Sequence, residues 1–423
     1  MLSISSIKEK PEQIIRRLAI RGIDATESIH KIINLDEQRR ELQYKRDNIL
    51  NNINEVSKSI GQLFREGKAV EAEEFKQKSS ILKEEAKAIE AEMAQIETEM
   101  HEILIFLPNT PNETVPTGKS AEDNEVVKTG GNKPELDPKL PHWDLITKYD
   151  IIDFELGNKI TGAGFPVYKG KGAKLQRALI SFFLDEAEKA GYTEVIPPLM
   201  VNEDSAYGTG QLPDKDGQMY KIGADNLYMI PTAEVPVTNI YRDVIIQEDR
   251  LPIKNSAYSA CFRREAGSWG ADVRGLNRLH QFDKVEIVRI EKPENSYKAL
   301  DEMVNHVEGL VIKLGLPYRI LKLCGGDMGF TSALTFDFEV FSAAQERWLE
   351  VSSVSNFETF QANRLKLRYR NNETKKNIIA HTLNGSALAL PRIMAAILEN
   401  YQTENGINIP EVLVPYTGFS VIN

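Results

Sequence analysis

The chain has 423 residues, of which 41% are hydrophobic and 27% are charged, a composition typical of a globular protein of two or three domains. Lys and Arg together number 52 and Asp and Glu 62, which gives a formal net charge of −10. A protein that coats nucleic acid without sequence preference is expected to be basic, so this charge argues against that class.

The cysteines and the lengths of the apolar runs indicate the compartment. Cys261 and Cys324 are too few for a disulfide framework or a four-cysteine zinc site, and neither lies in a recognisable ligand cluster, so we expect no zinc. Every apolar run is shorter than the roughly 18 residues needed to cross a bilayer, and the first ten residues lack the order of a signal peptide. We therefore expect a cytoplasmic protein without a membrane partner.

Residues 27–105 carry a seven-residue hydrophobic repeat in two runs, which is the pattern of a coiled coil. Neither run contains a proline, and Gly61 and Gly67 bracket the break between them. The simplest structure is a long antiparallel helical hairpin, with each helix roughly 50 Å long. We expect an arm rather than a domain core, within an N-terminal domain of residues 1–107. The repeat positions are Leu35, Leu42, Ile49, Val56 and Leu63, then Phe75, Leu82, Ile89, Ile96 and Ile103.

Prolines and glycines punctuate residues 108–142, which we interpret as a linker to a second domain at 143–423. In that domain the predicted strands often follow one another directly, which favours an antiparallel sheet flanked by helices, an α+β fold, over a doubly wound one. The chain has neither G-x-G-x-x-G after a strand nor G-x-x-x-x-G-K-[ST], so no Rossmann or P-loop site is indicated. Predicted helices are 172–190, 295–314 and 391–404, and predicted strands are 194–200, 226–231, 257–265, 280–291, 334–341 and 347–355.

Two predicted neighbouring strands carry charged and aromatic residues on one face. Arg263 and Glu265 alternate at the end of the first strand, and Phe282, Lys284 and Glu286 alternate along the second. Arginine forks match phosphate or carboxylate oxygens, and an aromatic ring can stack on a base. A solvent-facing ladder of ion pairs explains the same pattern about equally well.

Three shorter motifs also carry polar side chains in suggestive places. Thr232 and Glu234 lie between two prolines and suit an ammonium group. Glu350 and Ser352 share one predicted strand face and suit Mg²⁺. Arg392 follows Pro391 at the start of a predicted helix, where anions bind. Taken singly, a polar turn, an edge strand and a routine loop-to-helix junction are the simpler interpretations.

The order and spacing of these motifs resemble bacterial seryl-tRNA synthetase, a class II aminoacyl-tRNA synthetase, over essentially the whole chain. The segments that carry the resemblance are 191–198, 262–282 and 388–392, which look like class II motifs 1, 2 and 3, together with 208–213, 232–236, 280–286, 326–329 and 384–386 of the seryl branch. The chain departs from the family at Ala387 and Pro391, where glycine is usual.

The resemblance implies a serine–tRNA ligase that forms seryl-adenylate from L-serine and ATP and then transfers serine to tRNA(Ser), and also to tRNA(Sec). It implies Mg²⁺ bound with ATP on Glu350 and Ser353, and catalytic roles for Arg263 and Arg392. The implied serine contacts are Thr232, Ala233, Glu234, Arg263, Glu286, Asn384 and Ser386, and the implied ATP contacts are Arg263, Arg264, Glu265, Phe282, Glu350, Val351, Ser352, Ser353 and Arg392.

The resemblance also implies a homodimer through motif 1 and an N-terminal arm that binds tRNA. The arm is acidic, with 12 Lys and Arg against 17 Asp and Glu in residues 27–105, so its basic residues must be segregated if it contacts RNA. A solvated helical surface of mixed charge is the simpler reading of the arm. The candidate contacts are Arg39, Arg40, Lys45, Arg46, Lys76, Lys83 and Lys87.

Other functions fit the sequence less well. A catalytically inactive paralogue that binds tRNA or regulates is disfavoured because the candidate charged residues are all present. A ligase that loads serine onto a carrier protein is disfavoured because such relatives lack the long arm.

Overall fold

The computed structural model describes residues 1–136, 139–214, 216–266 and 274–423. These residues form two compact units, Met1–Ala19 with Ile23–Pro108 and Ile20–Gly22 with Asn109–Asn423. None of the described helices is both long and apolar enough to cross a membrane.

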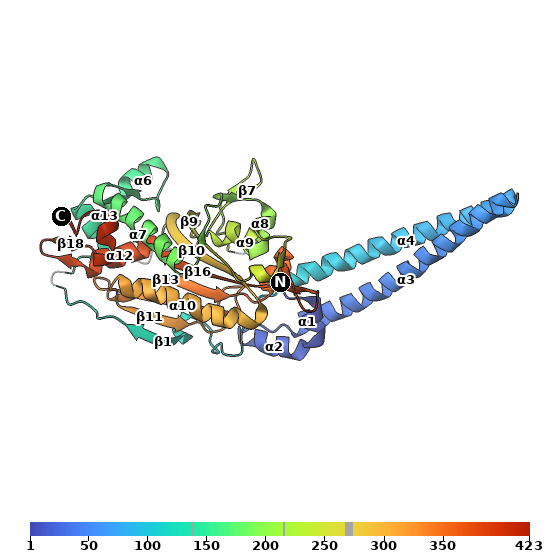
Figure 1. Ribbon diagram of the computed structural model, residues 1–423, viewed down its shortest axis with the longest axis horizontal. Helices are drawn as coiled ribbons and strands as arrows, with labels where there is room; N and C mark the ends of the chain where they lie inside the picture. The colour runs from blue at the N-terminus through green and yellow to red at the C-terminus, as the bar shows by residue number, and fades with distance from the viewer. Residues whose placement is uncertain (137–138, 215, 267–273) are drawn as a thin grey trace. The chain divides into compact units, whose positions relative to one another are not determined.

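The first unit is helical and contains the predicted antiparallel hairpin, whose two long helices run side by side (Figure 1). Its core forms where Leu35 and Leu42 pack against Met93, Ile96 and Met100, so the heptad columns face each other as predicted. The chain reverses at Gly67, which adopts the left-handed region at φ 75°. The helices are α1 (Ile4–Glu9), α2 (Pro11–Ala19), α3 (Thr26–Arg65) and α4 (Ala69–Leu104).

The second unit is built on an eight-stranded sheet in the order β1-β11-β12-β13-β16-β10-β9-β4. All neighbours pair antiparallel except β4 with β9, so the predicted antiparallel α+β architecture is confirmed. The strands are β1 (Glu125–Gly130), β4 (Thr193–Glu194), β9 (Ile253–Phe262), β10 (Gln281–Glu291), β11 (Tyr318–Lys322), β12 (Leu334–Ser342), β13 (Arg347–Asn356) and β16 (His381–Ala389).

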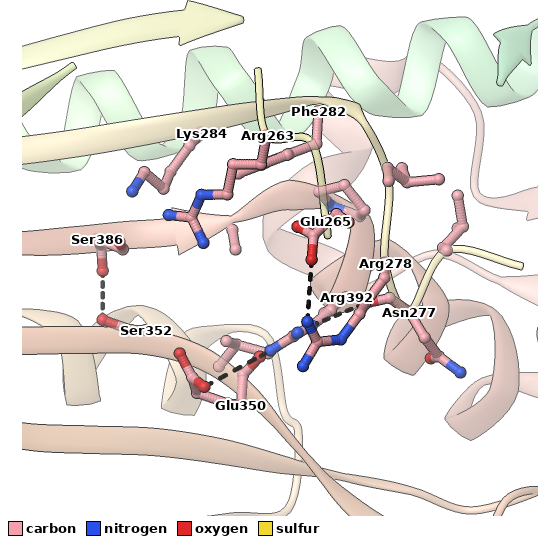
Figure 2. Close-up of a pocket in the computed structure, with 15 residues that line it drawn as sticks. Arg263, Glu265, Asn277, Arg278, Phe282, Lys284, Glu350, Ser352, Ser386 and Arg392 are labelled. Carbon is pink, nitrogen blue, oxygen red and sulfur yellow. Dashed lines mark hydrogen bonds and ion pairs between the residues drawn. The ribbon is translucent and has the colours of Figure 1, made fainter. Parts of the chain in front are cut away.

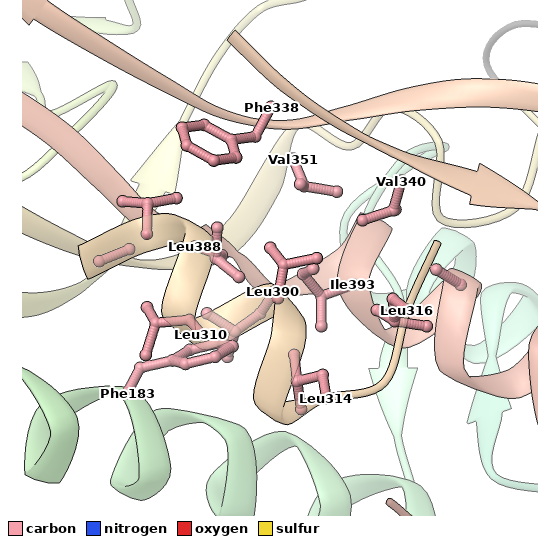
Figure 3. Close-up of a cluster of buried hydrophobic side chains, with 14 of the residues drawn as sticks. Phe183, Leu310, Leu314, Leu316, Phe338, Val340, Val351, Leu388, Leu390 and Ile393 are labelled. Carbon is pink, nitrogen blue, oxygen red and sulfur yellow. The ribbon is translucent and has the colours of Figure 1, made fainter. Parts of the chain in front are cut away.

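Three helices cover one face of this sheet and share a single hydrophobic core with it (Figure 3). They are α7 (Gly170–Lys189), α10 (Ser296–Lys313) and α12 (Leu390–Asn400). Phe183, Leu310 and Ile393 come from these helices and meet Phe338 and Leu388 of the strands, all with at most 1% of their surface exposed. The opposite face carries polar residues such as Glu286, and farther along β10 it carries Val288 and Ile290, which pack in two smaller apolar clusters.

The remaining elements are short and surround the sheet. The helices are α5 (His142–Lys148), α6 (Phe154–Ile160), α8 (Glu203–Thr209), α9 (Glu234–Asn239), α11 (Phe360–Leu365) and α13 (Val414–Thr417). The strands are β2 (Ile152–Asp153), β3 (Val167–Tyr168), β5 (Met200–Val201), β6 (Lys221–Ile222), β7 (Leu227–Met229), β8 (Ile245–Gln247), β14 (Arg368–Arg370), β15 (Asn377–Ile379), β17 (Gln402–Thr403), β18 (Gly406–Asn408) and β19 (Val421–Ile422).

The structure differs from the predicted elements in several places. The predicted strand 194–200 is reduced to β4 and β5, because Pro197 and Pro198 between them cannot donate to a ladder. Helix α12 stops at Asn400, four residues earlier than predicted, and the expected linker 108–142 contributes strand β1 to the edge of the sheet. Gly61, expected near the turn, lies inside α3.

Candidate active site

Two adjoining cavities are lined by residues of the strands β10, β12, β13 and β16, by the start of α12 and by neighbouring loops. Six side chains line both cavities and so mark the junction between them: Arg263, Glu265, Arg278, Lys284, Glu350 and Ser386. Figure 2 shows Arg263 and Lys284 directed into this space from one side, with Glu350 and Arg392 on the other. The second cavity encloses about 500 Å³, which lies in the range of small-molecule sites.

Strand β10 separates the core from the cavities by simple alternation. Val285 and Ile287 are fully buried in the hydrophobic core, whereas Phe282, Lys284 and Glu286 line the cavities. Successive side chains of a strand point to opposite faces, so this is the arrangement that the sequence predicts.

The first cavity combines an aromatic ring with arginines. The Arg263 guanidinium lies 5.2 Å from the centre of the Phe282 ring, and Arg278 pairs with Glu265 at 2.9 Å. The predicted strand 257–265 ends earlier, at Phe262, and Glu265 beyond its end takes a positive φ of 48°. Arg263 and Glu265 nevertheless line the same cavity, as expected.

Arg392 enters the first cavity from the first turn of α12. Its Nε donates to the carbonyl of Asn277 at 3.0 Å, and its Nη1 donates to the carbonyl of Glu350 at 2.6 Å. Pro391, one of the two departures from the family pattern, lines the same cavity at the start of the helix. The other departure, Ala387, is fully buried in the core.

The second cavity contains a buried carboxylate that accepts hydrogen bonds from several donors. Glu286 Oε2 accepts from the hydroxyl of Thr232 at 3.0 Å and from that of Ser386 at 3.4 Å. The ammonium of Lys284 lies 2.8 Å from the same oxygen, and both side chains of this ion pair are buried. Asn384 lines the same cavity.

A second carboxylate, Glu234, lies close to Glu286 at the start of α9. Gln361 donates to its Oε1 at 2.6 Å, and Asn384 also hydrogen-bonds to it. Burial, and then the negative charge of Glu286, raise the pKa of Glu234 to about 7. A cation bound beside the two carboxylates would therefore favour the ionised form of Glu234 and offset the repulsion between them.

The prediction that Glu350 and Ser352 share a strand face is wrong. The pairing of β12 with β13 shifts by one residue, because Phe338 pairs with Ser352 but Glu339 pairs with Glu350. Ser352 is consequently buried, and its hydroxyl donates to the carbonyl of Ser386 at 2.5 Å. Ser353 takes its place beside Glu350 in the second cavity.

Asp337 adds a third oxygen group beside Glu350 and Ser353. It pairs with Ser353 across the β12–β13 ladder, and its Oδ1 is buried without a hydrogen-bond partner in the described part of the chain. Burial, and then the charge of Glu350, raise the pKa of Asp337 well above its ordinary value. Two carboxylates and a hydroxyl form a donor set that suits Mg²⁺, which prefers oxygen ligands.

Three of the expected contacts do not reach the cavities with a polar side chain. Ala233 is buried in a small cluster with Val237, and Val351 contributes an apolar side chain to the first cavity. Arg264 donates instead to the carbonyl of Gly217 at 3.3 Å, away from both sets of lining residues.

Several candidate RNA contacts on the arm already have partners within it. Arg39 and Arg40 both pair within α3 with Asp36, which is 1% exposed and also binds Lys8 of α1, so Asp36 links the two helices. Arg46 pairs with Asp47 at 3.0 Å and Lys76 pairs with Glu73 at 2.9 Å. Of the predicted set, Lys45, Lys83 and Lys87 have no ion pair among the residues that the structure describes.

Three cavity residues or their partners were not singled out from the sequence, whereas Lys284 was, because it alternates with Phe282 and Glu286 on the same strand. Asn277, Gln361 and Asp337 left no such signal, because only the tertiary fold brings them to the site.

An antiparallel sheet with a cavity formed by its strands and by the helix that carries Arg392 is the arrangement of the class II aminoacyl-tRNA synthetases. Residues 220–401 match the tRNA synthetase class II core domain (G, H, P, S and T), and residues 1–111 match the seryl-tRNA synthetase N-terminal domain. The chain is an aminoacyl-tRNA ligase. It belongs to the seryl-tRNA synthetase family.

Curated relatives and solved structures agree over the full length. The serine–tRNA ligase of Salinibacter ruber is 51% identical, covering 100% of this chain and 99% of its own, and that of Carboxydothermus hydrogenoformans is 47% identical, covering 99% and 98%. The crystal structure of seryl-tRNA synthetase from Pyrococcus horikoshii complexed with ATP is similar with a TM-score of 0.92 and 32% identity, covering 100% of this chain and 99% of that one.

The raised pKa of Glu234 predicts a pH-dependent cost to stability. A carboxyl group with a raised pKa in the folded state stabilises the fold at low pH, and this contribution is lost as the pH rises through about 7. We expect Glu234→Gln to raise the free energy of unfolding by about 1–3 kcal/mol at pH 8 and by much less at pH 5. Thermal unfolding of both proteins at the two pH values measures this, and an equal effect at both would contradict it.

Proposed function

We propose that the chain is a serine–tRNA ligase of the cytoplasm, which activates L-serine with ATP and transfers it to the 3′ end of tRNA(Ser). The observation that carries this proposal is the pair of joined cavities. One holds two buried carboxylates with hydroxyl and amide groups, the other holds an aromatic ring with arginines, and they share Arg263 at the junction. An amino acid and a nucleotide would meet there.

The second cavity has the chemistry to select serine. Its carboxylates, Glu234 and Glu286, would bind the ammonium group, and the hydroxyl and amide groups of Thr232, Asn384 and Ser386 lie close enough to pair with the serine hydroxyl and ammonium. Alanine and glycine would leave these buried polar groups unpaired, which is a strong basis for rejecting them.

The first cavity has the chemistry to hold ATP. The Phe282 ring would stack on adenine, with Glu265 at the adenine amino group, while Arg263 would bind the α-phosphate and the serine carboxylate. Arg392 would bind the γ-phosphate from the positive end of α12, with two of its nitrogens already fixed on backbone carbonyls.

Arg263 and Arg392 would assist the first step without forming a covalent bond to the substrate. The serine carboxylate attacks the α-phosphorus, the bond to the β-phosphate oxygen breaks, and pyrophosphate leaves while the seryl-adenylate stays bound. The two arginines align the reactants and neutralise the charge that develops on the phosphates. In the second step the terminal ribose hydroxyl of tRNA displaces AMP.

Mg²⁺ with ATP is the cofactor that we propose, and zinc is not part of the proposal. Glu350 and Ser353 would hold the ion, with Asp337 beside them. When bound, Mg²⁺ would neutralise part of the phosphate charge. The chain's own contribution is to present oxygen ligands next to Arg392, whose Nη1 lies 3.8 Å from the Glu350 carboxylate.

Replacement of Glu286 tests the serine site. We expect Glu286→Ala to lower serine-dependent ATP–pyrophosphate exchange about a hundredfold or more, because it removes a buried carboxylate that would bind the substrate ammonium. ATP binding without serine, measured by calorimetry, is the control that the neighbouring cavity is intact. Exchange within a few-fold of wild type would rule out this role for Glu286.

We propose that the arm binds the tRNA. Lys45, Lys83 and Lys87 are the candidates that keep their charge free of ion pairs among the described residues, so they would contact phosphates and recognise the shape of a folded RNA. The proposal extends to tRNA(Sec), which is bound by an M. kandleri SerRS in a solved complex of similar fold at 16% identity, with a TM-score of 0.58.

Deletion of the arm separates the two steps. Replacing residues 30–104 by a short Gly-Ser turn should leave serine-dependent exchange largely intact, because the cavity residues all lie beyond residue 200, and should abolish tRNA charging. A finer variant is Lys83→Glu with Lys87→Glu, which should weaken charging, whereas Glu84→Gln is the matched control. Near-normal charging by the deleted enzyme would exclude the arm as the tRNA-binding element.

We propose a homodimer that buries the segment around β4 and β5. Ile196 is 88% exposed, and Leu199 and Met200 next to it are 39% and 46% exposed, so an apolar strip beside two prolines is uncovered in the single chain. Sedimentation should give twice the mass of one chain at micromolar concentration, and Ile196→Glu should shift the protein towards the monomer. A wild-type monomer under these conditions would contradict the proposal.

A further inference from the structure

A buried polar network lies outside the two cavities and is centred on Glu399 in the last turn of α12. The side chain of Glu399 is fully buried. Its Oε1 accepts from the backbone N–H of His142 at 3.0 Å, from the His142 ring at 2.8 Å and from Gln345 Nε2 at 3.0 Å, and its Oε2 accepts from the Ser342 hydroxyl. Burial alone raises the pKa of the Glu399 carboxyl, but these donors hold it below its ordinary value.

The first branch of the network runs through the His142 ring, which is also fully buried. Because Nδ1 faces a carboxylate, it carries the ring proton, and Nε2 is left as an acceptor for the backbone N–H of Leu276 at 2.8 Å. Gly275 permits this close approach, since a Cβ there would lie 2.3 Å from Nε2. The ring therefore fixes the backbone at Leu276, shortly before the chain enters β10.

The second branch runs through Gln345 and ends one residue further along. The Oε1 of Gln345 accepts from Asn277 Nδ2 at 3.0 Å, so Glu399 holds residues 276 and 277 by two separate routes. The carbonyl of Asn277 in turn accepts from Arg392 Nε (Figure 2). The network thus connects the far end of α12 to the guanidinium at its beginning, by way of the segment that borders the first cavity.

We propose that Glu399, His142 and Gln345 are positioning residues, which fix the Leu276–Asn277 backbone and through it orient Arg392 towards the terminal phosphates of ATP. The inference rests on the proposed ATP site. Arginine has many rotamers, and a guanidinium held at Nε and Nη1 by two carbonyls presents its remaining N–H groups in one direction only. Loss of the hydrogen bond to the Asn277 carbonyl would leave the Arg392 guanidinium free to reorient.

A purely structural role for the network gives a different expectation from a positioning role. If the network only supported packing, its loss would disturb the whole first cavity and weaken every nucleotide. If it orients Arg392, its loss should weaken nucleotides that carry the terminal phosphates and spare AMP, because adenine and the α-phosphate are held by other side chains in the proposed site. The ratio of ATP to AMP affinity therefore distinguishes the two.

Calorimetric binding of ATP and AMP to the full chain without serine tests the inference, with Mg²⁺ present throughout. Arg392→Ala is the reference, and it should weaken ATP at least tenfold while changing AMP by less than about threefold. Glu399→Gln and Gln345→Met should show the same pattern, with ATP weakened about tenfold. Gln345 is only partly buried, so its variant serves if Glu399→Gln unfolds.

Gln402→Met is the matched control for these variants. It removes a glutamine that hydrogen-bonds Leu140 and the carbonyl of Glu399 in the same region but has no link to Asn277, and it should bind both nucleotides normally. Equal weakening of ATP and AMP by Gln345→Met and Glu399→Gln, or no weakening of either, would overturn the inference while Arg392→Ala still discriminates. If Arg392→Ala itself fails to discriminate, the proposed role of Arg392 at the γ-phosphate is wrong as well.

Discussion

Two carboxylates, Glu234 and Glu286, are buried in one cavity, and much of the second unit is arranged to make that possible. Like charges in a low-dielectric site repel, and desolvation disfavours each of them further. Glu286 is balanced by the ion pair to Lys284 and by two hydroxyl donors, whereas Glu234 has amide donors and a pKa raised to about 7. The side chains of this site are therefore short of positive charge.

That shortage is what gives the proposed serine site its affinity for an ammonium group. A substrate cation would relieve the repulsion, so part of the electrostatic cost of building the cavity is recovered on binding. Lys284 limits the cost through its ion pair with Glu286, and it lies at the junction where a substrate carboxylate would also need a cation. The same residues thus explain both stability and selectivity.

The sequence predicted the regular parts of this structure and failed where regularity ends. The heptads gave the hairpin and the alternation along β10 gave the cavity face, since both follow from the period of one element. The face predicted for Ser352 was wrong because a bulge between β12 and β13 reverses the alternation of side chains after Glu350. No residue type in the sequence indicates such a bulge. The pairing of Arg39 and Arg40 with Asp36 could not be predicted, because Asp36 is polar and no pattern in the sequence indicates that it is buried.

The side chains that we propose bind ATP and Mg²⁺ also lie where the strands and helices depart from regular geometry. Strand β9 ends before Glu265, the β13 bulge moves Ser353 to the side of Glu350, and α12 starts with Arg392 over the sheet. Each departure turns a side chain or a helix end towards one of the two cavities, while the hydrophobic core beneath stays continuous. A regular sheet would hold these groups on alternating faces. Irregular segments have fewer ladder hydrogen bonds to hold them in place. The buried hydrogen bonds from Glu399 through Gln345 to Asn277 therefore supply rigidity that regular strand pairing would otherwise provide.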